Sequence, residues 1–329
     1  MEAIEAALHE IERAVVGKRD VLEIVMIGLL AGGHLLIEDV PGQAKTLIAR
    51  SFAQVTDLSF GRIQFTPDLI PADVTGSALP TGGFNAIEAD GRSAMVFQPG
   101  PIFANLVLGD EINRAPPKTQ AALLEAMEER QVTVDGISHL LPSPFMVIAT
   151  QNPIEADGTY PLPAAQLDRF LIKTSVGYPS RQDEEAVLRA RVDRGSDSHD
   201  LRTTLSMSDI VGLQTAVENV AVDDDVISYV TAIARATRGH QQIETGASTR
   251  GSISLVRAAR ARALLNRRDF VVPTDVKALA EPVLAHRLVT TTEAWVRGVS
   301  ATAIVQECLD SIAVPEALTP DDREALGQP

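Results

Sequence analysis

Short apolar runs alternate with segments of helical period through the first half of the chain. Leu35-Leu36-Ile37 is a compact apolar run, and residues 46–54 follow it with helical spacing. Further apolar runs at residues 58–65, 105–108 and 145–150 predict buried strands. Strands that alternate with helices are typical of a parallel α/β sheet, in which ligands bind beyond the carboxyl ends of the strands.

Two hairpins are predicted to interrupt this α/β pattern. Residues 79–97 carry turn signals at Gly82-Gly83 and at Asp90-Gly91, and residues 132–141 carry one at Asp135-Gly136. Paired strands around such dipeptides form antiparallel hairpins. We therefore expect two β-hairpins that lie outside the parallel sheet.

The pattern changes near Gly177–Arg181, beyond which only helical periods are found. These helical segments are residues 182–192, 206–219, 223–238, 249–267 and 273–288. A chain of 329 residues is long enough for two domains. We predict an α/β domain of residues 1–179 and a smaller all-α domain of residues 180–329.

Composition and charge narrow the class of protein. Apolar residues make up 45% of the chain and charged residues 22%, as in soluble globular proteins. The net charge of −15 opposes binding to nucleic acid and to anionic membranes. Cys308 is the single cysteine, which fits a reducing compartment, and the apolar stretch 24–33 is too short to span a bilayer. Glu2 and Glu5 argue against an N-terminal signal, so we expect a cytoplasmic protein without stable membrane insertion.

Residues 37–46, IEDVPGQAKT, partly match the phosphate-binding loop pattern G-x-x-x-x-G-K-[ST]. Lys45 and Thr46 are in place, whereas Asp39 and Ala44 stand at the two glycine positions. An apolar run before the loop and a helical period after it supply the strand–loop–helix context that the pattern requires. The alternative interpretation is an ordinary helix start after a Pro-Gly turn.

Other polar residues at predicted strand ends supply what phosphoryl transfer to water needs. Lys45 would contact the β- and γ-phosphates of ATP, and Thr46 with Asp110 would hold Mg²⁺. Glu111 would polarise the attacking water, and Asn152, at the exit of the neighbouring strand, would fix that water. The order and spacing of these residues favour a nucleotide hydrolase.

Each of these signals also has a structural interpretation. An Asp-Glu pair after an apolar strand is commonly a solvated strand end, and an asparagine at a strand exit commonly caps a turn. Arg169 and Arg250 are candidates for contact with the γ-phosphate. Arg169 is equally able to pair with Asp168 or Asp157.

Three long strings closely resemble the MoxR family of AAA+ ATPases. They are GPIFANLVLGDEINRAPPKTQAALLEAMEERQVTVDG (100–136), VIATQNPIEADGTYPLPAAQLDRF (147–170) and GASTRGSISLVRAARARAL (246–264). The resemblance extends from about Val15 to about Arg287. It implies an AAA+ P-loop core with a parallel sheet, a smaller helical lid, and ATP with Mg²⁺ as the bound nucleotide.

The resemblance also implies a role for each matching residue. Asp110 and Glu111 match the Walker B pair, and Asn152 matches sensor 1. Arg169 matches the arginine finger that reaches a neighbouring subunit's nucleotide, and Arg250 matches the sensor 2 arginine of the lid.

Nucleotide-binding residues are implied at two places. Val16-Gly17 matches the segment that flanks the adenine, with Lys18 where a glutamine is common. The P-loop residues expected to bind nucleotide are Val40, Pro41, Gly42, Gln43, Ala44, Lys45, Thr46 and Leu47.

The two departures in the P-loop differ in weight. An acidic residue like Asp39 is frequent in the family, whereas the family usually has glycine where Ala44 stands. A methyl group there is expected to clash with phosphate or to resist a positive φ. Our hypothesis is that nucleotide still binds, but more weakly; the alternative is that the loop tolerates alanine without strain.

The resemblance further implies a ring homo-oligomer, usually a hexamer, in which the two predicted hairpins are the helix 2 insertion and the pre-sensor-1 hairpin. Such proteins are thought to be chaperones that remodel or activate partners. The partners are often von Willebrand factor A-domain proteins, and maturation of metal-dependent enzymes is a recurrent role. We expect such a client and no nucleic-acid partner.

Three other functions stay open. A nucleotide-gated scaffold with little turnover is favoured by Ala44 but opposed by intact Glu111, Asn152, Arg169 and Arg250. A motor subunit of a metal-chelatase-like complex is a related alternative. A DNA-translocating motor is disfavoured by the charge of −15.

Overall fold

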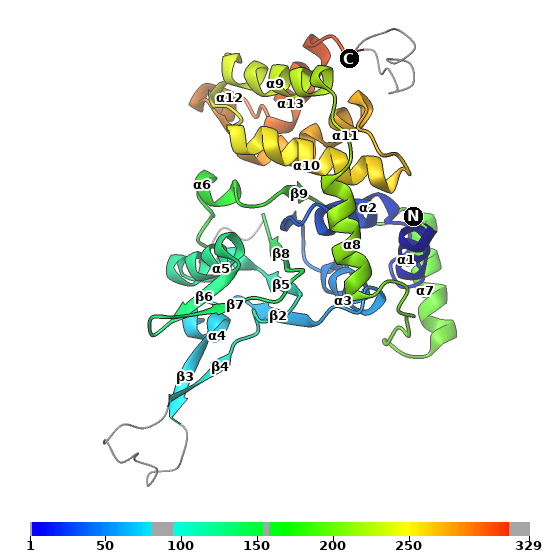
Figure 1. Ribbon diagram of the computed structural model, residues 1–329, viewed down its shortest axis with the longest axis vertical. Coiled ribbons are helices and arrows are strands. Elements are labelled where there is room, and N and C mark those ends of the chain that lie inside the picture. The colour runs from blue at the N-terminus through cyan, green and yellow to red at the C-terminus, as the bar shows by residue number, and fades with distance from the viewer. Residues whose placement is uncertain (1, 81–94, 154–157, 316–329) are drawn as a thin grey trace. The chain divides into compact units, whose positions relative to one another are not determined.

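A computed structural model describes residues 2–80, 95–153 and 158–315 of the chain (Figure 1). The backbone divides into two compact units, Glu2–Leu213 and Gln214–Pro329. No helix within the described ranges is long and apolar enough to cross a membrane.

The first unit is built on a five-stranded sheet in the order β2-β5-β8-β1-β9, and all its neighbouring strands are parallel. The strands are β1 (Leu35–Glu38), β2 (Phe60–Gln64), β5 (Leu106–Asp110), β8 (Met146–Gln151) and β9 (Ile172–Thr174). The predicted parallel α/β sheet is confirmed. Because Glu38 lies opposite Gln151 and Gln64 opposite Asp110, the carboxyl ends of these strands meet at one edge.

The inner strands are continuous apolar runs because the sheet is covered on both faces. On one face, Val107 of β5 and Val147 of β8 join a buried cluster with Leu123, Leu124 and Met127. The last three come from α5, which begins after a proline, a residue suited to the first turn of a helix. The helices of this part of the unit are α1 (Glu2–Glu12), α2 (Arg19–Leu30), α3 (Lys45–Val55), α4 (Pro71–Thr75), η1 (Ile112–Arg114), α5 (Pro117–Glu129) and α6 (Ala164–Leu167).

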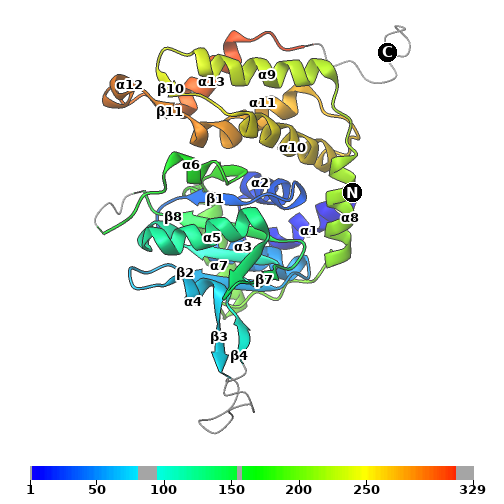
Figure 2. The ribbon, with the colours of Figure 1, turned by 60° about the vertical axis from the view of Figure 1, so that its left-hand side comes forward.

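Both predicted hairpins are confirmed as antiparallel pairs. They are β3 (Gly76–Pro80) with β4 (Met95–Pro99), and β6 (Gln131–Val134) with β7 (Ile137–Leu140). Asp135 and Gly136 both have positive φ, as a two-residue turn that matches the strand twist requires. The turn signals at Gly82-Gly83 and Asp90-Gly91 lie outside the described residues. Figures 1 and 2 show β3 and β4 side by side, projecting from the sheet of their unit.

The second unit is helical, as expected, apart from a short sheet that the sequence patterns do not predict. Its elements are the end of α8 (Met207–Glu218), α9 (Asp224–Gly239), β10 (Ile243–Thr245), α10 (Thr249–Leu265), α11 (Pro273–Leu284), η2 (Ala285–Arg287), β11 (Val289–Thr290), α12 (Thr292–Val296) and α13 (Ala301–Ser311). Strands β10 and β11 pair antiparallel. Their few residues are too short to show a strand period.

The division between units falls within α8, later than the predicted domain boundary at residue 179. Helix α7 (Arg181–Arg194) and the segment after it belong to the first unit. The physical reason is a set of backbone hydrogen bonds, since the N–H groups of Thr204 and Leu205 donate to the carbonyl of Val55 at 2.9 and 3.1 Å. The predicted boundary at residue 179 rests on a change in sequence pattern. As a division between a nucleotide-binding core and a lid, it remains a prediction.

Candidate nucleotide-binding site

A cavity of about 410 Å³ opens at the edge where β1, β5 and β8 end. It is lined by Pro41, Gly42, Gln43, Ala44, Lys45, Thr46, Leu47, Asp110, Glu111 and Asn152. The fold thus brings together loops that are far apart in sequence, and every residue in this lining was a candidate from the sequence alone.

The P-loop connects β1 to α3 through two residues with positive φ. Gly42 has φ 86°, a conformation that glycine adopts readily. Ala44 has φ 53° and ψ 15°, in the left-handed region, directly before the first residue of α3. A residue with a Cβ atom is disfavoured there by about 1–2 kcal/mol. Glycine would adopt this conformation without that cost, so Ala44 holds the loop in a strained backbone conformation.

Lys45 begins α3 and is tied to the loop that precedes it. Its Nζ donates to the carbonyl oxygens of Asp39 at 2.8 Å and Val40 at 3.3 Å. Burial lowers the pKa of the Lys45 ammonium, and the nearby carboxylates of Asp39, Asp110 and Glu111 oppose that shift. The first-turn N–H groups of α3 and the Lys45 ammonium together make this end of the cavity suited to phosphate.

Asp39, at the first glycine position of the pattern, has a structural role as a hydrogen-bond acceptor. The residue is 9% exposed. One oxygen accepts from the N–H of Val40 at 2.8 Å, and the other accepts from the N–H groups of Val176 at 2.8 Å and Gly177 at 2.6 Å. Lys18 contacts the same turn, because its Nζ atom donates to the carbonyl oxygens of Val176 at 2.8 Å and Gly177 at 2.9 Å. The acid thus fastens the P-loop to the segment that follows β9.

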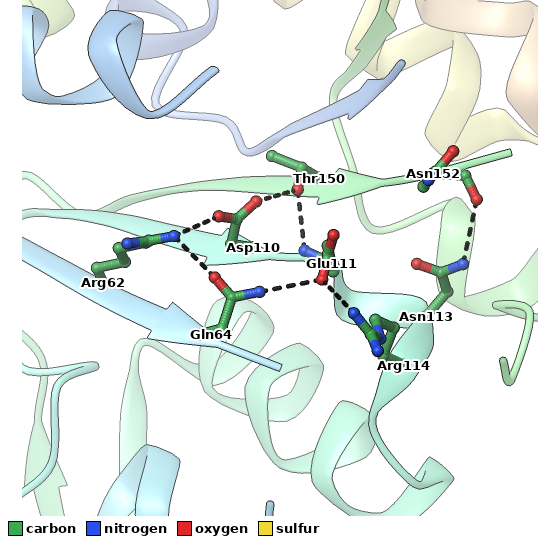
Figure 3. Close-up of polar contacts among 8 residues, drawn as sticks. All are labelled: Arg62, Gln64, Asp110, Glu111, Asn113, Arg114, Thr150 and Asn152. Atoms are coloured by element: carbon green, nitrogen blue, oxygen red, sulfur yellow. Dashed lines mark hydrogen bonds and ion pairs between the residues drawn. The ribbon is translucent and has the colours of Figure 1, made fainter. Parts of the chain in front are cut away.

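Asp110 and Glu111 are held at the end of β5 by Thr150 of β8, which the sequence patterns did not single out (Figure 3). The Thr150 hydroxyl donates to Asp110 Oδ1 at 2.8 Å and accepts from the Glu111 N–H at 2.9 Å. Glu111 has φ 58° and ψ 49°, so the chain turns sharply out of the strand at this residue. This turn separates the directions of the two adjacent carboxylates.

The Glu111 carboxylate is bound by two side chains that sequence reasoning also missed. Its Oε2 atom accepts from Gln64 Nε2 at 3.1 Å and from Arg114 Nη1 at 3.0 Å. Gln64 ends β2, directly opposite Asp110 in the parallel register. Arg62, two residues earlier, donates to Asp110 Oδ2 at 2.8 Å (Figure 3). No sequence motif indicates the Arg62 and Gln64 contacts, because they follow from the register of β2 against β5.

Asn152 lies just beyond β8 and is 6% exposed while lining the cavity. Asn113 Nδ2 donates to the Asn152 carbonyl oxygen at 3.4 Å. This contact joins the exit of β8 to η1, which follows the Walker B pair. Asn152 and Glu111 line the same cavity.

The remaining candidates lie elsewhere in the described part of the chain. Arg169 pairs with Glu128 of α5 at 2.9 Å and is outside the cavity lining, while Asp157, one of its suggested partners, falls outside the described ranges. Arg250 lies on α10 of the second unit, exposed to solvent.

Val16 and Gly17, which are expected to flank the adenine, are likewise not part of this lining, and neither is Val40. Gly17 has φ 70°, a backbone conformation that favours glycine, and a Cβ atom there would displace the Asp183 carboxyl carbon, which lies 2.2 Å from its position. Val16 directly precedes it and is partly buried.

The cavity's side chains fit Mg²⁺ bound together with nucleotide. Within the described ranges, no group of three or more His, Cys, Asp or Glu residues is able to hold a metal ion. Mg²⁺ commonly uses one or two protein oxygens, several waters and the phosphates of its nucleotide. The Thr46 hydroxyl and the Asp110 carboxylate, both in the cavity lining, are such donors.

A strand–P-loop–helix with an acidic pair at the end of another parallel strand of the same sheet defines a P-loop nucleotide-binding protein. Residues 34–172 match the "ATPase family associated with various cellular activities (AAA)", and residues 235–308 match the "AAA lid domain". The chain is 41% identical to the chaperone MoxR1 of Mycobacterium tuberculosis, across 96% of this chain and 83% of that one. It is 32% identical to the protein MoxR of Paracoccus denitrificans, across 86% and 87% of the two chains. The chain belongs to the MoxR family of AAA+ ATPases.

Two further comparisons cover nearly the whole chain. The uncharacterized protein YeaC of Bacillus subtilis is 47% identical, across 94% of both chains. A crystal structure of a candidate ATPase from Cytophaga hutchinsonii superimposes with a TM-score of 0.86 at 37% identity, covering 96% of each chain. The AAA+ fold with a helical lid is therefore confirmed.

Proposed function

We propose that this protein binds ATP with Mg²⁺ in the cavity at the sheet edge and hydrolyses it to ADP and phosphate. The observation that carries the proposal is the cavity lining, in which a P-loop lysine and threonine meet a Walker B pair and a sensor asparagine. Membership of an AAA+ ATPase family supports hydrolysis as the general activity.

In this proposal, the N-terminus of α3 and Lys45 bind the phosphates of the nucleotide. Thr46 and Asp110 hold Mg²⁺, which supplies positive charge at the β- and γ-phosphates. Thr150 orients Asp110 by its hydrogen bond to Oδ1, leaving the carboxylate fixed relative to the P-loop threonine.

Glu111 acts as the general base. Its carboxylate accepts a proton from water while the water oxygen forms a bond to the γ-phosphorus and the bond to the ADP oxygen breaks. Asn152, on the neighbouring loop, fixes the position of that water. Gln64 and Arg114 both donate to Glu111 Oε2, so the orientation of the general base depends on these two neighbours.

Two arginines complete the proposed site from outside this cavity. Arg169 acts on the nucleotide of a neighbouring subunit, and its absence from the lining of the cavity in its own chain supports this role. Arg250, within the matched lid region, acts as sensor 2. Such a site is complete only in a ring, which we propose is a homo-oligomer, with the hexamer of the family as the expected size.

We propose a chaperone role, in which ATP turnover in the cytoplasm remodels or activates a protein client. A relative that is 41% identical is named a chaperone, which supports this role. A protein with a von Willebrand factor A domain is the proposed partner, and maturation of a metal-dependent enzyme is the proposed process. Capture of partners by the Glu111→Gln form, with Lys45→Ala as the nucleotide-free control, tests this role; a partner set without any such domain contradicts it.

A nucleotide-gated scaffold is the second candidate, favoured by the left-handed Ala44. It predicts nucleotide binding with almost no turnover. A chelatase-like motor is less well supported, since a magnesium-chelatase subunit of Acidiphilium rubrum matches only 61% of this chain at 30% identity. Steady-state ATPase of the wild type beside Glu111→Gln separates the enzyme from the scaffold, because a scaffold has almost no turnover to lose.

A further inference from the structure

Arg62 and Gln64 form a bridge between the two carboxylates of the Walker B pair (Figure 3). Arg62 Nη2 donates to Asp110 Oδ2 and to Gln64 Oε1, both at 2.8 Å. Gln64 Nε2 then donates to Glu111 Oε2 at 3.1 Å. Arg62 and Gln64 are two residues apart on β2, so their side chains share one face of the strand.

The bridge fixes which way the Gln64 amide points. A glutamine side chain has a carbonyl oxygen that only accepts and an NH₂ group that only donates. Because Arg62 supplies only donors, it engages the carbonyl oxygen of Gln64 and directs the NH₂ group toward Glu111. The hold of Gln64 on Glu111 therefore depends on where the Arg62 guanidinium lies.

Asp110 is the point at which this bridge meets the proposed metal site. Both its carboxylate oxygens have partners, Oδ1 with Thr150 and Oδ2 with Arg62. A divalent cation near Asp110 and the Arg62 guanidinium carry like charge and compete for the same carboxylate. Thr150 is neutral and remains compatible with the metal. Of the two partners, Arg62 is the one whose charge opposes a metal ion at Asp110.

We propose that Arg62 is a positioning residue that couples divalent metal at Asp110 to the orientation of Glu111 through Gln64. The proposal rests on the nucleotide site described above. Arg62 is 42% exposed and lies on the edge strand of the sheet, so its guanidinium can move into solvent when metal binds. Gln64 then loses the partner that oriented it, and Glu111 is freed from one of its two described side-chain donors.

Mn²⁺ is a direct probe of this coupling because its binding is read by electron paramagnetic resonance without any turnover. The full-length protein is titrated with Mn²⁺ in saturating ADP. Arg62→Gln removes the competing charge, so the Mn²⁺ concentration for half-saturation should fall by roughly two- to five-fold. Arg62→Lys keeps the charge and should stay near the wild-type value. Arg50→Gln is the control, because it changes the net charge by the same amount as Arg62→Gln. Arg50 lies on α3 near Phe60, so its substitution should not shift the Mn²⁺ midpoint.

A second measurement tests the link to Glu111. If Arg62 acts through Gln64, then Gln64→Ala should change turnover far less in the Arg62→Gln background than in the wild type, because effects along one path are not additive. Additive effects would remove Gln64 from the coupling.

An unchanged Mn²⁺ midpoint in Arg62→Gln, or an equal shift in Arg50→Gln, overturns the inference. If wild-type protein hydrolyses ATP while the midpoint is unchanged, the inference alone fails. If wild-type protein binds neither ADP nor Mn²⁺, the proposed function fails and the inference fails with it. Circular dichroism of each variant confirms that the fold is retained.

Discussion

Replacing Ala44 with glycine should relieve a measurable backbone strain in the P-loop. Ala44 has φ 53° and ψ 15°, a conformation that disfavours residues with a Cβ atom by about 1–2 kcal/mol. Glycine adds backbone freedom to the unfolded chain, which offsets about 0.5–1 kcal/mol of that gain. We expect the free energy of unfolding to rise by about 0.5–1 kcal/mol, measured by chemical denaturation.

The same substitution should strengthen nucleotide binding, if the strain disfavours the loop shape that receives phosphate. Since about 1.4 kcal/mol corresponds to a ten-fold change in affinity, a strain of about 1 kcal/mol limits the gain to about five-fold. Isothermal titration with ATP and Mg²⁺ in the Lys45-intact, hydrolysis-blocked Glu111→Gln background measures this directly. Steady-state turnover of Ala44→Gly alone shows whether hydrolysis also speeds up.

Arg267 provides a matched control for this argument. It is an exposed residue of the second unit with φ 60°, so Arg267→Gly should give a similar gain in stability. It should leave ATP affinity unchanged, since it is not among the cavity-lining residues. If Ala44→Gly changes neither stability, affinity nor turnover, then the loop tolerates alanine without strain and our reasoning is refuted.

Two further substitutions test separate parts of the site. Asp39→Ala leaves the N–H groups of Val176 and Gly177 without their buried acceptor and should lower the free energy of unfolding by about 2–4 kcal/mol. A loss below about 0.5 kcal/mol in denaturant titration would show that this contact contributes little. Mixing Arg169→Ala with Lys45→Ala subunits should restore part of the ATPase activity at mixed interfaces, whereas failure to complement in assembled rings would leave Arg169 as a structural partner of Glu128.

The parallel sheet and the cavity lining could be predicted from the sequence for a physical reason. Strands buried on both faces are uninterrupted apolar runs, and polar residues directly after such runs collect at one sheet edge. Asp110, Glu111 and Asn152 were found in this way, and the structure brings them to the P-loop.

The residues that contact Asp110 and Glu111 could not be predicted from the sequence, because most of them lie on other strands. Arg62, Gln64 and Thr150 reach Asp110 and Glu111 only through the register of β2 and β8 against β5, which apolar patterns do not specify. Arg114 lies three residues after Glu111, but its contact depends on the left-handed turn at Glu111.

The role of Asp39 was hidden for a related reason. The sequence showed only that an acid replaces a glycine, whereas its two most distant donors lie beyond β9 at Val176 and Gly177. The short β10–β11 pair escaped prediction since a period of two residues cannot be recognised in strands of this length.

The central claim is that Glu111 of this chain catalyses ATP hydrolysis. The most direct test is steady-state ATPase of the assembled protein with Mg²⁺, wild type beside Glu111→Gln, with ATP binding measured on both. We predict clear turnover in the wild type and a loss of at least ~100-fold in Glu111→Gln, with ATP binding retained. Equal turnover in the two proteins, or almost none in a wild type that binds ATP, would contradict the account.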